Sequence, residues 1–291
     1  MLAHAIGLGI YNPDGDCVQM LGRRESWEAI GYEVTGILEK GNKVEIFRPA
    51  ENSPNRISEI YTGTQHLIVA RSFDDRESEL AWIADSIRRD VRDEGVAPEK
   101  IVVISLNPRR DVVRSNLSNL QSRLLEFAIP STIPGVLNSS DAFAEPGYVT
   151  LTTVFRAKGN EADVIYVMNF EFLYDFVDEP GIRNQAFAAI SRSKAWVRIT
   201  GIGKKMEVAT KEINNILGDQ PYFRFVFPDM NEIQRRLDAG TKKRRREKAD
   251  AASALTKLRN LNKRAILAAM EEDPSSVKEL KKLMDELDDE P

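Results

Sequence analysis

Short hydrophobic runs of strand length alternate with longer stretches of helical periodicity through most of the chain. Five such runs are expected to be buried strands: 66–73, 100–106, 148–154, 162–170 and 196–202. The intervening and following stretches carry apolar residues three or four positions apart, as helices do: 75–94, 110–128, 183–194 and 204–217. Strands that alternate with helices predict an α/β fold, a mostly parallel sheet with helices on both faces.

A β-hairpin is expected before the first of these strands. Residues 32–38 and 43–48 alternate apolar and polar side chains, and the segment 39–42 between them, Glu-Lys-Gly-Asn, is typical of a tight turn. Because the hairpin precedes the alternating part of the chain, we interpret it as an insertion near 32–48.

The character of the sequence changes after Pro228, where strand-like runs stop and helical patterns continue to the end. We therefore expect a domain over 1–228 and an α-helical charged tail over 229–291. Within 234–264 there are twelve Lys or Arg against three acidic residues, whereas 271–290 has nine acidic residues against three Lys. A basic block followed by an acidic one suggests an interaction appendage.

The basic run TKKRRREK at 241–248 is compatible with two interpretations. It would bind nucleic-acid phosphates without sequence preference, or it is a solvated helix face. The apolar stripes of the tail likewise predict helices that dock either on the chain's own domain or on a protein partner.

Composition excludes several classes of protein. Cys17 is the only cysteine, which excludes a disulfide framework and a cysteine-based metal site, and favours a reducing cytoplasm. Only two histidines are present, His4 and His66, which argues against a His-rich metal centre. No apolar run approaches the ~20 residues that a membrane-spanning helix needs. The first eleven residues carry no basic leader and no small-residue cleavage site, so no signal peptide is expected. We expect no metal site of the chain's own and no membrane contact.

The segment TTVFRAKGNEADVIYV, 152–167, places four polar side chains between two hydrophobic strands. They are Arg156, Lys158, Asn160 and Glu161. Gly159 in the turn allows positive φ or a close approach to a ligand. Because ligands of open α/β sheets sit at the carboxyl ends of strands, this cluster would meet a nucleotide or a nucleic-acid strand there. From spacing alone, an ordinary charged loop is an equally good interpretation.

The segment NQAFAAISRSKAWVRITG, 184–201, is a small apolar helix followed at once by a strand. Arg192 is expected to project from the helix end toward the edge of the sheet. A fixed guanidinium there can bind phosphate through two hydrogen bonds and stabilise charge during phosphoryl transfer. Taken alone, the segment favours a surface arginine paired with an acid.

Together the two segments resemble motifs V and VI of superfamily 1 helicases of the UvrD/Rep type, in the right order and spacing. FRAKGNEADVIYV is similar to the strand-AKG-x-E-strand block, and AAISRSKAWVRITG to the helix-TRA-strand block. The resemblance extends over about 1–203 and is specific in 152–202. It implies a RecA-like fold, the second motor domain of an ATP-dependent DNA helicase.

The resemblance implies a role for three residues in the nucleotide site. Glu161 matches the motif V glutamate that binds the ribose of ATP, and Gly159 matches the turn glycine before it. Arg192 matches the motif VI arginine that reaches the γ-phosphate across the cleft. The preceding Ser191 replaces the common threonine and keeps its hydroxyl.

The same resemblance implies a path for single-stranded DNA. Thr153 and Lys158 match motif V positions at or near that path, and Arg156 is adjacent to it. Phe155 stands where many members have histidine. We expect Phe155 to pack in the interior, with stacking on a base as the alternative.

The other half of an ATP site is absent from this sequence. No GxxxxGK[ST] loop occurs, and no convincing strand ends in Asp-Glu, so nothing is expected to hold the phosphates and Mg²⁺. ATP with Mg²⁺ would be shared with a first motor domain, either of the same parent chain or of a separate one, and the motif IV arginine is expected just before Met1. The rival hypothesis is a stand-alone or degenerate helicase-like module that binds nucleic acid or protein without catalysis.

Overall fold

The computed structural model describes residues 1–13, 17–52, 57, 66–135, 142–175, 180–239, 241, 242, 246, 250 and 253. The chain divides into two units, Met1–Arg235 and Arg236–Pro291. Residues 230–239 are helical, and most of the predicted tail lies outside the described residues. The domain boundary near 228 therefore stays a prediction.

The centre of the first unit is a six-stranded sheet in the order β3-β8-β7-β4-β6-β5. Its strands are β3 (Ile68–Phe73), β4 (Ile101–Ser105), β5 (Ser131–Thr132), β6 (Val149–Thr153), β7 (Ala162–Met168) and β8 (Ser193–Ile202). Every pairing between them is parallel. The predicted fold class, an α/β arrangement with a parallel sheet, is confirmed.

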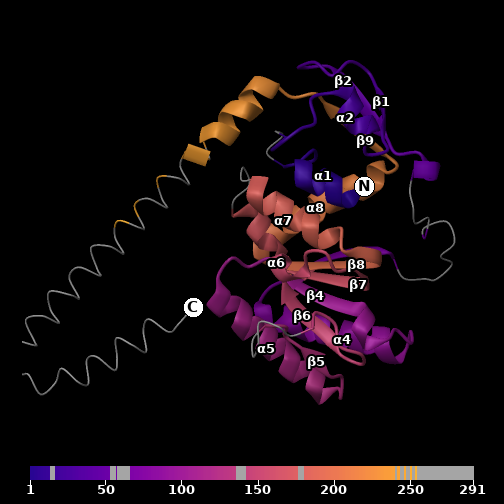
Figure 1. Cartoon of the computed structure of the whole chain (residues 1–291), viewed down its shortest axis with the longest axis vertical. Helices are drawn as coiled ribbons and strands as arrows, with labels where there is room; N and C mark the ends of the chain where they lie inside the picture. Colours follow the sequence, from indigo (N-terminus) through magenta and orange to yellow (C-terminus); the bar gives the residue numbers. More distant parts are fainter. Residues whose placement is uncertain are drawn as a thin grey trace, which may run out of the picture. The chain divides into compact units, whose positions relative to one another are not determined.

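Helices cover both faces of this sheet (Figure 1). One face carries α4 (Arg76–Arg92) and α5 (Arg110–Glu126). The other carries α1 (Leu2–Leu8), α7 (Pro180–Ile190) and α8 (Gly203–Asp219). The sequence defines the start of α4 locally, since the Asp75 side chain accepts a hydrogen bond of 2.7 Å from the backbone N–H of Ser78.

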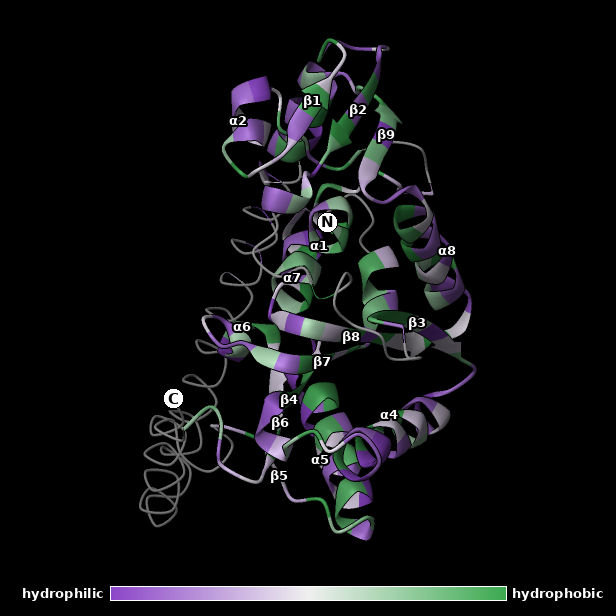
Figure 2. Ribbon diagram, turned by 90° about the vertical axis from the view of Figure 1, so that its right-hand side faces the viewer, coloured by the Kyte–Doolittle hydropathy of each residue, from purple (hydrophilic) through white to green (hydrophobic). Residues whose placement is uncertain are grey.

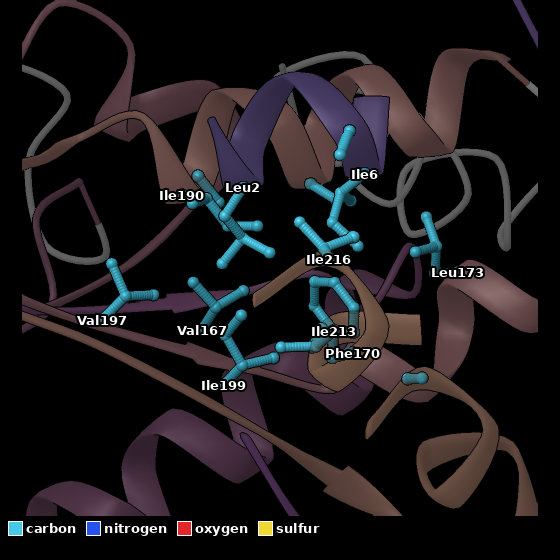
Figure 3. Packing of buried hydrophobic residues seen from close by; sticks show 14 of the residues in the cluster. Leu2, Ile6, Val167, Phe170, Leu173, Ile190, Val197, Ile199, Ile213 and Ile216 are labelled. Atoms are coloured by element: carbon cyan, nitrogen blue, oxygen red, sulfur yellow. The ribbon is translucent and has the colours of Figure 1, made fainter. Parts of the chain in front are cut away.

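Strand alternation divides the buried side chains into two cores. Val167 and Ile199 point to the face covered by α1, α7 and α8, where they meet Ile6, Ile213 and Ile190 (Figure 3). Tyr166 and Val103 point to the opposite face, toward α4 and α5. Because both faces are buried, the central strands are continuous apolar runs and are easy to identify in the sequence.

A second, antiparallel sheet lies beyond α1 and α8 (Figure 2). Its strands are β1 (Glu33–Thr35), β2 (Lys43–Phe47) and β9 (Tyr222–Val226), in the order β1-β2-β9. The first two strands pair as a hairpin across the 39–42 turn. The strand β9, which pairs with β2 from the far end of the domain, is not among the strands predicted from the sequence.

The remaining elements are short. They are α2 (Arg24–Glu28), α6 (Val154–Ala157) and the 3-10 helices η1 (Ala50–Asn52), η2 (Pro98–Lys100) and η3 (Phe170–Tyr174). In the described part of the chain, no helix combines the length and apolar character needed to cross a membrane.

A fully buried ion pair joins the helices of one face. Arg183 on α7 donates to both carboxylate oxygens of Glu212 on α8, at 3.0 and 3.4 Å, and to the carbonyl oxygen of Ile6 at 2.9 Å. The Tyr174 hydroxyl donates to the same carboxylate. Burial, followed by the negative charge of Glu212, raises the pKa of Tyr174 above its usual range, so the phenol stays protonated and remains a donor.

Glu212→Gln should lower the free energy of unfolding by about 3 kcal/mol or more, because it leaves the Arg183 charge buried without a counter-charge. Urea unfolding measures the loss. The control is Lys40→Gln, which removes a pair whose lysine side chain is 71% exposed and should cost less than about 1 kcal/mol. Equal small losses in the two variants would show that the buried pair does not hold the helices.

Candidate nucleotide and nucleic-acid sites

The segment 153–161 connects the two edges of the parallel sheet. Thr153 ends β6 at the carboxyl edge, and Ala162 begins β7 at the amino edge. The sequence predicts a simple turn here, but the segment contains the one-turn helix α6. The helix is needed because β6 and β7 are parallel with β4 between them, so the chain must return across the sheet.

Glu161 and Arg192 are neighbours at the amino edge of the sheet. Each directly precedes a strand, and the residues that follow, Ala162 and Ser193, are paired in the β7–β8 register. The backbone N–H of Ala162 donates to the Arg192 carbonyl oxygen at 3.1 Å. The expectation that the whole 156–161 cluster lies at the carboxyl ends of strands is therefore wrong for Glu161, because the segment has already crossed the sheet when it reaches that residue.

The Arg192 side chain is half-buried and is bonded to its own helix end. Its Nε donates to the Ala188 carbonyl oxygen at 3.1 Å, and its Nη2 to Ser191 Oγ at 3.3 Å. A cation at the carboxyl end of a helix is stabilised by the helix dipole. The guanidinium was expected to project toward the sheet edge, but it folds back on α7, so a phosphate would have to displace these contacts.

A hollow of about 690 Å³ opens beside Arg192, lined in part by its sequence neighbours Ser191, Ser193 and Lys194. Arg48 also lines it, and no lining residue described by the structure is acidic. Burial, then the charges of the Met1 amino group and Arg48, lowers the pKa of the neighbouring His4 to about 4. The hollow therefore has cationic groups and hydroxyls that suit a phosphorylated ligand.

Gly159 and Lys158 form the exposed turn before Glu161. Gly159 has φ +86°, and an added Cβ would meet no atom within 4 Å. This glycine is therefore needed for its left-handed backbone and not for close packing. Lys158 ends α6 with its side chain in solvent.

At the carboxyl edge, Thr153 and Arg156 line a groove of about 910 Å³. Its walls and floor come from the ends of β4 and β6, the first turns of α5, the loop 133–135, α6 and Gln185 of α7. We refer to it as the arginine groove, since Arg110 and Arg114 of α5 also line it, and no described lining residue is acidic. Among the described residues, no carboxylate forms an ion pair with Arg110, Arg114 or Arg156.

Two further details favour a ligand in the arginine groove. The Arg156 guanidinium lies directly over Gly135, where any side chain would collide with it. The hydroxyl of Thr152, a groove residue only 2% exposed, has no hydrogen-bond partner. A buried hydroxyl without a partner is uncommon, and a polar group in the groove would supply one.

The prediction that Phe155 packs in the interior is wrong, because its side chain is 77% exposed. Val154 and Ala157, three positions apart on α6, occupy the buried face of the helix. Phe155 and Arg156 consequently face outward into the groove.

The contribution of α5 to this site is not among the predictions made from the sequence. Asn107, Arg110 and Arg114 follow the buried strand β4, and the segment 110–128 was read only as a helix. The indication was present in the sequence, since polar residues directly after a buried strand belong to the carboxyl edge of a parallel sheet.

No protein-family model matches the chain, and no curated protein is significantly similar to it. Among solved structures, the chain is similar to the C-terminal domain of a possible DNA helicase from Lactobacillus plantarum WCFS1. The sequence identity is 14%, the match covers 52% of this chain and 83% of that chain, and the TM-score is 0.35. At this level of similarity no residue role is transferred from that domain.

Gly159→Ala should lower the free energy of unfolding by about 1 kcal/mol, because alanine resists the left-handed conformation. Gly218 is the matched control: it also has open space around it, but it lies within α8. Gly218→Ala should instead raise the free energy of unfolding by about 0.5 to 1 kcal/mol. Urea unfolding measures whether the two substitutions change the free energy of unfolding in opposite directions. An unchanged free energy in Gly159→Ala would contradict the prediction.

Proposed function

We propose that this chain is the second motor half of a UvrD/Rep-type DNA helicase, with ATP binding at the amino edge of its sheet and single-stranded DNA at the carboxyl edge. The observation that carries the proposal is the course of the segment 153–161. It runs from Thr153 in the arginine groove to Glu161, the neighbour of Arg192. One short segment thus belongs to two candidate sites, as a motor that couples nucleotide and DNA requires.

At the amino edge, the two side chains fit complementary parts of ATP. The Glu161 carboxylate is an acceptor suited to ribose hydroxyls, and the Arg192 guanidinium is a donor suited to phosphate. Bound ATP with Mg²⁺ supplies the phosphoryl group whose transfer is catalysed. Arg192 would leave the Ala188 carbonyl oxygen, bind the terminal phosphate and stabilise its charge, while a first motor domain provides the phosphate-binding loop.

At the carboxyl edge, Arg110, Arg114 and Arg156 would bind the phosphates of one DNA strand. Backbone contacts of this kind confer little sequence preference. Thr153 would add a hydroxyl to the groove, and Lys158 would extend the cationic surface along the turn.

The rival proposal is a module that binds nucleic acid or protein without catalysis. The arginine groove alone would be sufficient for such a module, because this chain supplies all the described residues of the groove. The two proposals differ in one respect. Only a motor half should restore DNA-stimulated ATP hydrolysis when it is combined with a first motor domain.

Co-expression with a candidate first motor domain should give DNA-stimulated ATPase activity that Arg192→Ala reduces by about 10³-fold or more, the usual contribution of such an arginine. The chain alone should hydrolyse ATP negligibly. Lys211→Ala, at an exposed position of α8, is the control and should leave the rate unchanged. An unchanged rate in Arg192→Ala would refute the assigned role, and normal turnover by the chain alone would refute the shared site.

Arg110→Gln and Arg114→Gln should each weaken binding of a fluorescent oligodeoxythymidylate by about ten-fold, the effect of losing one charge-assisted hydrogen bond. Each should also reduce the slope of log K against log salt by about 0.7. Lys211→Gln makes the same charge change on the opposite face of the sheet and should alter neither quantity. Fluorescence anisotropy across a salt series measures both, and equal losses in all three variants would indicate a nonspecific effect of net charge.

A further inference from the structure

Phe155 is an exposed aromatic ring with no structural reason for its exposure. Its side chain is 77% exposed, and the other exposed large hydrophobic residues in the described part of the chain are aliphatic. They are Ile30, Ile37, Leu125 and Val226. The inward positions of α6 are taken by Val154 and Ala157, which are 7% and 2% exposed.

The surroundings of the ring restrict what could cover it. Phe155 lines the arginine groove with Arg110, Arg114 and Arg156, and no described lining residue carries a negative charge. Ile133 and Pro134 add apolar surface to the same groove. An occupant therefore needs a flat apolar face for the ring and negative charge for the guanidinium groups. A nucleobase attached to a phosphate backbone combines the two.

We propose that Phe155 stacks on a base of the single strand held in the arginine groove. This inference rests on the proposed function, and it adds a contact that does not involve the phosphates. The phosphate contacts supply the salt-dependent part of the affinity, and the ring supplies a part that is independent of salt and tolerant of sequence, because every base has a π face.

The structure also explains how the ring is presented. The Arg156 guanidinium lies over Gly135, which leaves the preceding residue of α6, Phe155, free to extend into the groove. A one-turn helix anchored by two buried residues limits the motion of its outward side chains. A phenylalanine side chain has only two rotatable torsions, so little conformational entropy is lost when a base stacks on the ring.

The test uses the whole chain and four variants. Phe155→Leu keeps an apolar side chain but removes the ring, and Phe155→Trp keeps a ring. Leu125→Ala removes a similarly exposed apolar side chain outside the groove (71% exposed). Arg110→Gln reports the phosphate contacts. Each protein is titrated with oligodeoxythymidylate, with an abasic deoxyribose-phosphate oligomer of equal length, and with polyglutamate of equal charge.

Stacking predicts that Phe155→Leu binds oligodeoxythymidylate about ten-fold more weakly than wild type, which corresponds to ~1.4 kcal/mol. Its salt slope should equal that of the wild type, whereas Arg110→Gln lowers the slope. Phe155→Trp and Leu125→Ala should bind within two-fold of wild type. The difference between Phe155→Leu and wild type should vanish on the abasic oligomer, which isolates the ring–base term.

Three results would overturn the inference, and they are distinguishable. If wild type binds the oligonucleotide with a normal salt slope and Phe155→Leu binds equally well, the groove holds DNA and the ring does not stack. If polyglutamate binds wild type as tightly as the oligonucleotide does and loses affinity in Phe155→Leu, the occupant is an acidic peptide. If wild type binds no oligonucleotide at low salt, the proposed function fails together with the inference.

Discussion

The buried pair of Arg183 and Glu212 is the interaction on which the geometry of this domain most depends. Apolar contacts among α1, α7 and α8 are strong but tolerate rotation and sliding. Two charges without access to water are tolerated only in a specific arrangement, with their hydrogen bonds made to one another and to neighbours. The pair therefore fixes α7 against α8 and, through the Ile6 carbonyl, against α1. Arg192 follows the carboxyl end of the helix that is fixed in this way.

The parallel sheet then separates the two candidate sites. Parallel strands place all their amino ends on one edge and all their carboxyl ends on the other. Residues that precede β7 and β8, Glu161 and Arg192, must lie together, and so must residues that follow β4 and β6, which form the arginine groove. The two sites lie at opposite edges of the sheet, and the segment 153–161 joins them because it connects β6 to β7.

The sequence was sufficient to predict the elements that are determined by residues close together in the chain. The central strands, α4 and the hairpin follow from continuous apolar runs, a cap and a turn. Other features depend on partners distant in sequence. β9 pairs with β2 across most of the domain, and the arginines of α5 reach the groove only because β4 lies beside β6. Arg183 stands within an apolar helical pattern, and only the position of Glu212 explains its burial.

The error at Phe155 has a different cause, a change of periodicity within one short segment. Strand alternation puts residues two positions apart on the same face, and a strand continued past Thr153 would place Phe155 on the face of Leu151 and Thr153. One turn of helix instead pairs Val154 with Ala157 and turns Phe155 and Arg156 outward together. An isolated helical turn leaves almost no trace in a hydrophobic pattern, because two apolar positions fit a strand end equally well. The exposure of the Phe155 ring is therefore the more informative observation. Contacts within the chain do not offset the free-energy cost of exposing the ring to water, whereas stacking on a base in the arginine groove would offset it.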